Sequence, residues 1–60
     1  MSKKDYILIA TAINAEWRYR FDNAEAKAGI LGVVHTLADA LERENTKFDR
    51  QRFVEACLTA

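Results

Sequence analysis

Two side chains in this sequence could act as a nucleophile and its base, Cys57 and His35. A cysteine beside a histidine forms the activated pair of many nucleophilic enzymes, provided that a third group orients the base. No pattern in the sequence supplies that third group, and 60 residues leave little room for a substrate pocket beside a core. We therefore expect Cys57 to be a small buried residue, His35 to be partly exposed or at an interface, and the protein not to be an enzyme.

The same two residues bear on metals and on covalent cross-links. A structural zinc site draws four ligands from cysteine and histidine, and the chain has one of each. A single cysteine also excludes an intrachain disulfide. Because the sequence contains no phosphate-binding motif either, we predict neither a metal nor a cofactor.

Three basic residues, Lys47, Arg50 and Arg52, surround the expected start of the last helix. Basic side chains at that position of a recognition helix would suit a helix-turn-helix protein, so these residues are candidates for DNA contact. Asp49 and Glu55 lie in the same segment, however, and nine Lys and Arg balance nine Asp and Glu over the chain. DNA binding is therefore the alternative function, because the net charge provides no basic footprint.

A different set of residues predicts contact with another protein. The run Trp17-Arg18-Tyr19-Arg20 could stack on bases from a loop, but on a helix its side chains point in different directions. Tyr, Trp and Arg are enriched at protein interfaces. The other apolar residues of this helix form a surface that is wider than one neighbouring helix can cover. In the next helix, two glycines leave a surface without side chains that another helix could approach closely. The candidate protein interface comprises Ile7, Leu8, Trp17, Tyr19, Arg20, Gly29 and Gly32.

The segments that carry these residues are predicted to be helices, because the chain has no proline and is rich in helix formers. Ile30, Val34, Leu37 and Leu41 recur at steps of 4, 3 and 4, which places them on one stripe of a helix. We expect this helix to run to about residue 44. A break near Gly29 is the alternative, because glycine costs about 1 kcal/mol relative to alanine inside a helix.

The first helix is expected to begin at Lys3, because Ser2 is a suitable N-cap and Asp5 lies at the capping-box spacing. Met1 could pack on Tyr6 as a hydrophobic staple. The buried stripe of this helix is expected to contain Tyr6, Ile9, Ala10, Ile13, Trp17 and Phe21.

Residues 21–23 should break the first helix from the second, with Asp22 or Asn23 as the cap. In the second helix, Asp39 and Arg43 are spaced to form an exposed ion pair. A polar connector then leads to a third helix over residues 50–58. Asp49 is its expected N-cap and Phe48 and Phe53 have the spacing of a hydrophobic staple. The candidate buried face of this helix consists of Phe53, Val54, Ala56 and Cys57.

Together these elements predict an all-α fold with one domain over residues 1–60. We expect an antiparallel helical hairpin of two long helices plus a short C-terminal third helix. A chain of this size buries a small core, so we also predict a homodimer, formed through the first helix or through the glycine face of the second. The apolar runs are too short to span a bilayer and no signal peptide is recognisable, so we expect a cytoplasmic protein without a membrane partner.

Both ends of the chain resemble a family of short uncharacterised proteins encoded by bacteriophages and plasmids. The similarity covers about the first ten and the last fifteen residues: Lys3-Lys4-Asp5-Tyr6 with Ile9-Ala10, and Lys47-Phe48-Asp49-Arg50 with Arg52-Phe53 and Ala56-Cys57. The chain departs from the family at Thr46, where proline is frequent, and after Cys57, where glycine is common. The resemblance implies that the protein originates from a mobile element and is located in the cytoplasm of the host cell. It does not identify any functional residue. We predict a small non-enzymatic accessory protein that acts by binding a host or phage protein.

Overall fold

The computed structural model describes residues 2–59 and contains three α-helices, α1 (Lys3–Tyr19), α2 (Ala24–Glu44) and α3 (Arg50–Leu58). No strand occurs within residues 2–59. The all-α prediction is confirmed, as are the expected helix starts at Lys3 and Arg50 and the expected end of α2. Since α2 is continuous through residues 29–32, the break considered near Gly29 does not occur.

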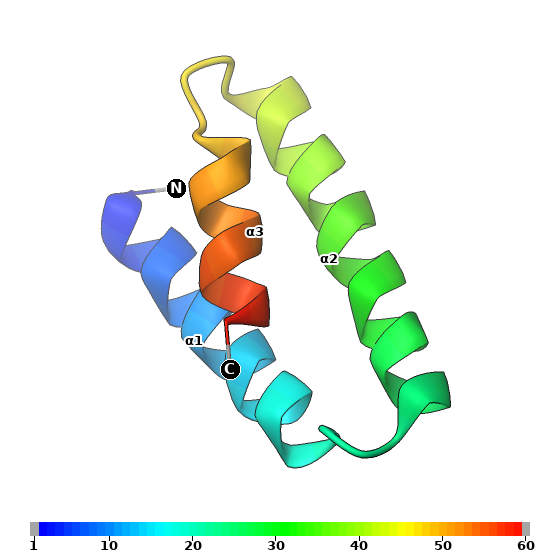
Figure 1. The fold of residues 1–60 in the computed structure, drawn as a ribbon. Helices are drawn as coiled ribbons and strands as arrows, with labels where there is room; N and C mark the ends of the chain where they lie inside the picture. The colour runs from blue at the N-terminus through cyan, green and yellow to red at the C-terminus, as the bar shows by residue number, and fades with distance from the viewer. Residues whose placement is uncertain (1, 60) are drawn as a thin grey trace.

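The two long helices do not pack along their length. They diverge from the turn at residues 20–23, and α3 lies in the space between them (Figure 1). α3 packs most extensively on α1 and next on α2, whereas α1 and α2 contact each other least. The expected antiparallel hairpin of the two long helices is therefore not confirmed, because the third helix lies between them.

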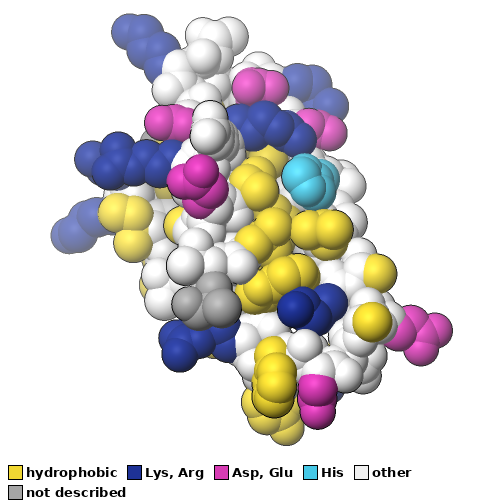
Figure 2. All heavy atoms as spheres, viewed as in Figure 1, with side chains coloured by type: hydrophobic (Ala, Val, Ile, Leu, Met, Phe, Trp, Pro, Cys, Tyr) yellow, Lys and Arg dark blue, Asp and Glu magenta, His cyan; other side chains and the backbone are white. Residues whose placement is uncertain are grey.

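The core is small and is shared by all three helices and the second connector. The largest side chains that are fully buried belong to Val34 in α2 and Cys57 in α3. Half-buried residues surround the core, and hydrophobic side chains remain visible along the seam between α2 and α3 (Figure 2). The buried residues are Ala10, Val34, Ala38, Phe48, Phe53 and Cys57.

The start of α1 is held as the sequence predicts. The backbone N–H of Ser2 donates to Oδ2 of Asp5 at 3.0 Å, which is the acidic half of a capping box. The expected contact of Met1 with Tyr6 lies outside the described residues. The ring of Tyr6 lies against Phe48, with ring centroids 4.8 Å apart.

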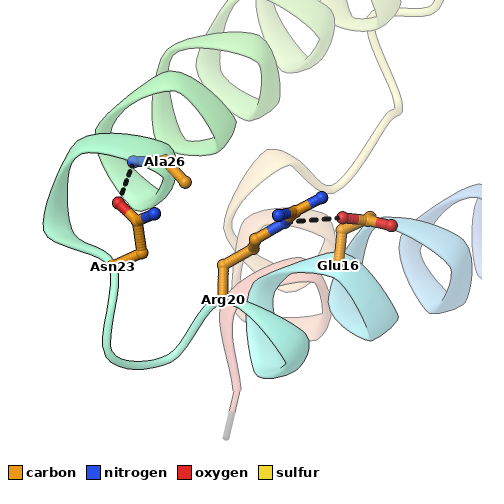
Figure 3. A network of polar contacts seen from close by, with 4 residues as sticks. All are labelled: Glu16, Arg20, Asn23 and Ala26. Carbon is orange, nitrogen blue, oxygen red and sulfur yellow. Dashed lines mark hydrogen bonds and ion pairs between the residues drawn. The ribbon is translucent and has the colours of Figure 1, made fainter.

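The other two helices are also capped by side chains. Oδ1 of Asn23 accepts the N–H of Ala26 at 2.9 Å, so Asn23 rather than Asp22 is the cap of α2 (Figure 3). Oδ1 of Asp49 accepts the N–H of Arg52 at 3.1 Å at the start of α3, as predicted.

A polar contact that the sequence did not reveal joins the first helix to the last. Nδ2 of Asn14, in α1, donates to the backbone oxygen of Cys57 at 3.0 Å and also to that of Thr59. The last carbonyl groups of a helix have no partner within the helix, so this side chain satisfies two of them. Asn14 therefore fixes the end of α3 on α1.

Three expectations about individual residues are wrong. Phe21 is 73% exposed, because α1 ends at Tyr19 and Phe21 falls in the turn. Ala56 is exposed rather than part of the buried face of α3. Asp39 pairs with Arg50 of α3 instead of Arg43, which ties α2 to α3.

Candidate interaction surfaces

The outer face of α1, formed by Leu8, Ala12, Ala15 and Tyr19, is an exposed apolar stripe. These residues follow one another at steps of 4, 3 and 4 and all are exposed. Leu8 is 69% exposed and Tyr19 is 74% exposed. Since Ala10 is buried on the opposite side of the helix, this face has no contact with the core.

At the end of α1, Arg20 is held beside the outer face. Its Nε donates to Oε2 of Glu16 at 3.3 Å (Figure 3). Its guanidinium carbon lies 5.0 Å from the centre of the Tyr19 ring. Both contacts are exposed to solvent, so they contribute little to stability. They do keep an aromatic ring and a cation together on the surface.

Trp17 belongs to a different part of the surface. It is half-buried, and the ammonium group of Lys27 lies 4.3 Å from the centre of its ring. An open hollow of about 430 Å³ lies beside it at the turn between α1 and α2. The hollow is lined by Trp17, Phe21, Asp22, Ala24, Lys27, Ala28 and Leu31.

The two glycines lie on the exposed side of α2, away from Val34. A Cβ atom at Gly29 or Gly32 would meet nothing within 4 Å. Within residues 2–59, no neighbouring element therefore packs closely against these two glycines. The residues predicted to form one protein interface are thus distributed over several separate surfaces.

A groove of about 440 Å³ lies between the first half of α1 and the start of α3. Its lining combines aromatic and aliphatic residues with three cations and one carboxylate. Ile7, which is 57% exposed, is one of its aliphatic residues. The full lining is Lys3, Tyr6, Ile7, Ala10, Asn45, Lys47, Phe48, Asp49, Arg52, Phe53 and Ala56.

This groove brings together residues that the sequence suggested for different reasons. Ile7 was a candidate for protein binding, whereas Lys47 and Arg52 were candidates for DNA contact. Lys3 was missed, because its only sequence signal was its place at a helix start. Figure 2 shows Lys and Arg side chains projecting at the upper left edge, where α1 and α3 begin.

Arg50, the third basic residue suggested for DNA contact, lies elsewhere. Its Nη1 is bonded to the carboxylate of Asp39, and its Nη2 is 3.5 Å from Nδ1 of His35. Arg50 therefore faces α2 and is paired, whereas Lys47 and Arg52 line the groove. His35 is exposed beside this ion pair.

Cys57 is fully buried, and burial raises the pKa of its thiol. A raised pKa keeps the thiol protonated, whereas a nucleophile needs the thiolate. His35 is exposed and faces Arg50, so the two residues do not form an activated pair. In residues 2–59, no three His, Cys, Asp or Glu side chains gather in a way that could hold a metal ion.

No protein-family model, no curated protein and no solved structure matches this chain. Among the described helices, none is both long and apolar enough to cross a membrane. The function therefore has to be inferred from the geometry and charge of these surfaces.

Proposed function

We propose that this is a small non-enzymatic accessory protein of a phage or mobile element, which acts by binding another protein. We further propose that it forms a homodimer through the outer face of α1 and acts in the host cytoplasm. The observation that supports the proposal is the exposure of Leu8 and Tyr19, at 69% and 74%, on a helix face that no described residue covers. Large apolar side chains gathered on one exposed face are typical of association surfaces.

The spacing of the outer face suits a two-fold pairing. In an isologous interface, if residue i of one copy meets residue j of the other, then j also meets i. Two antiparallel copies of α1 centred between Ala12 and Ala15 would place Leu8 of each copy opposite Tyr19 of the other. The alanines would then face each other at the centre, where small side chains allow two helices to approach closely.

The size of the core provides a second reason for self-association. A chain of 60 residues buries a limited fraction of its surface, and this one has six buried hydrophobic residues among those described. Dimerisation adds buried apolar area without lengthening the chain. Light scattering over about a hundredfold range of concentration tests this proposal. A constant monomer mass throughout that range would contradict the homodimer.

DNA binding remains the alternative function. The observation in its favour is that Lys47 and Arg52 line one groove together with Lys3. Against it, Arg50 is paired with Asp39, and the net charge of the chain is zero. A labelled duplex in about 50 mM salt distinguishes the two functions, because phosphate contacts are strongest at low salt. No shift at micromolar protein would remove the alternative.

A further inference from the structure

The groove between α1 and α3 gathers several positively charged side chains, although the net charge of the protein is zero. Lys3 is the first residue of α1, Lys47 lies in the connector between α2 and α3, and Arg52 lies in the first turn of α3. The two helices also begin on the same side of the molecule (Figure 1), and helix N-termini carry partial positive charge. The local excess of cations therefore arises from three segments that only the fold brings together.

None of these three cations forms an ion pair with a carboxylate within residues 2–59. The two ion pairs within residues 2–59 are those of Arg20 with Glu16 and Arg50 with Asp39. The one carboxylate that lines the groove, Asp49, accepts the backbone N–H of its own helix as the cap of α3. A ligand with several carboxylates would therefore meet a complementary charge distribution.

The groove also offers an apolar surface beside the cations. Its aromatic floor consists of Tyr6, Phe48 and Phe53. The ring of Phe48 lies between the other two in this series of contacts, with its centroid 4.8 Å from that of Tyr6 and 5.4 Å from that of Phe53. Ile7 extends this surface along α1 and is 57% exposed. A purely charged ligand such as a nucleic acid backbone would leave this apolar surface uncovered, whereas a peptide carries both kinds of group.

We infer that the groove binds an acidic segment of a partner protein. One apolar side chain of that segment lies on the aromatic floor beside Ile7, and its neighbouring carboxylates face Lys3, Lys47 and Arg52. This inference rests on the proposed function, since it names the class of partner. It uses a surface apart from the outer face of α1, so the two can be tested separately.

The first experiment selects ligands from a displayed library of short random peptides. Wild-type protein should select peptides in which aspartate and glutamate surround one large apolar residue. Their affinity should fall steeply as salt rises, because charge attraction contributes to binding. Selection of peptides without acidic residues, or unchanged affinity when the apolar residue is replaced by serine, would overturn the inference.

A pair of matched variants then localises the site. Lys47→Glu with Arg52→Glu reverses two cations of the groove, and Lys4→Glu with Arg43→Glu reverses two exposed cations outside its lining. Both double variants change the net charge by the same amount. A glutamate at position 52 also suits the start of a helix capped by Asp49, so this variant should fold.

We expect the groove variant to bind the selected peptides at least about tenfold more weakly and the control variant to bind them within about twofold of wild type. Equal losses in both variants would show unspecific charge attraction and would overturn the inference. So would tighter binding of a DNA duplex, or of vesicles containing anionic lipid, than of any selected peptide.

Light scattering on the same variants separates this inference from the proposed homodimer. If the groove inference alone fails, wild type remains dimeric but selects no acidic peptides. If the homodimer alone fails, the mass is that of a monomer while the groove variant still loses peptide binding. Amide chemical shifts provide the location: peptide should move the signals of Ile7 and Asn45, which line the groove, and leave those of Gly29 and Gly32 in place.

Discussion

The rings of Phe48 and Phe53 lie with their centroids 5.4 Å apart, one just before α3 and one in its second turn. This contact is a hydrophobic staple, which fixes the direction in which the connector enters the helix. Both residues are buried, so the staple is also part of the core and of the groove floor. The stability of the fold and the shape of the candidate site therefore depend on the same pair.

Phe53→Ala should remove much of the stability of the protein. Replacing a buried phenylalanine by alanine typically costs about 3–5 kcal/mol, whereas a chain of this length is expected to have roughly 3–9 kcal/mol in total. Chemical denaturation measures the loss, with Gln51→Ala on the exposed side of α3 as the control. A folded Phe53→Ala protein with an almost unchanged melting temperature would mean that α3 is not docked through this residue.

Asn14→Ala should destabilise the contact between α1 and the end of α3. The amide of Asn14 donates to the carbonyl groups of Cys57 and Thr59. The bond to Cys57 is partly buried, and leaving that carbonyl group unpaired costs about 1–2 kcal/mol. Thr11→Ala is the control, because that hydroxyl bonds to Ile7 within its own helix. Faster amide exchange confined to the end of α3 is the expected signature. Equal denaturation midpoints for the two variants would contradict it.

The sequence predicted the local features of this fold better than its packing. The capping-box acid Asp5, the N-cap Asp49 and the staple of Phe48 with Phe53 are short-range signals, and the structure contains all of them. The angle between the two long helices depends instead on the volume that α3 occupies between them. No spacing within one helix encodes that volume, and the expected antiparallel hairpin is not confirmed.

The groove is a further feature that depends on packing between distant segments and that the sequence did not predict. Its members Ile7, Lys47 and Arg52 were each noticed, but for two different functions, because the sequence does not show which helix ends meet. Arg50 was grouped with Lys47 and Arg52 by proximity in sequence, whereas its side chain reaches α2. The charge pattern near the start of α3 therefore did not show which of its basic residues share a surface.

Gly32→Ala should stabilise the protein. Position 32 lies inside α2, where alanine is favoured over glycine by about 1 kcal/mol, and the added methyl group would meet nothing within 4 Å. Thermal denaturation should therefore show a higher midpoint, and the mass measured by light scattering should stay that of the proposed dimer. A lower midpoint together with a weaker dimer would place the interface on the glycine side of α2 instead of the outer face of α1.

Stability should fall at alkaline pH because of Cys57. Burial raises the pKa of this thiol above the ordinary value of 9.0, so the unfolded chain loses its proton at lower pH than the folded chain. The contribution of the thiol is fully present below the unfolded pKa and is lost as the pH rises through the folded pKa. Denaturation of wild type and Cys57→Ala at several pH values isolates this term from the other titrating groups. Parallel pH profiles of the two proteins would contradict the prediction.

Leu8→Glu should convert the proposed dimer into a monomer, whereas Val33→Glu should not. Both residues are large, apolar and exposed, at 69% and 60%, but Leu8 lies on the outer face of α1 and Val33 lies on α2. A glutamate at position 8 would remove the apolar contact of Leu8 with Tyr19 of the other copy and place a charge in that apolar interface, which is costly. We expect the dissociation constant of the dimer to rise at least about tenfold for Leu8→Glu and to stay near that of wild type for Val33→Glu. Light scattering at several concentrations measures both constants, and equal weakening by the two substitutions would exclude the outer face of α1 as the interface.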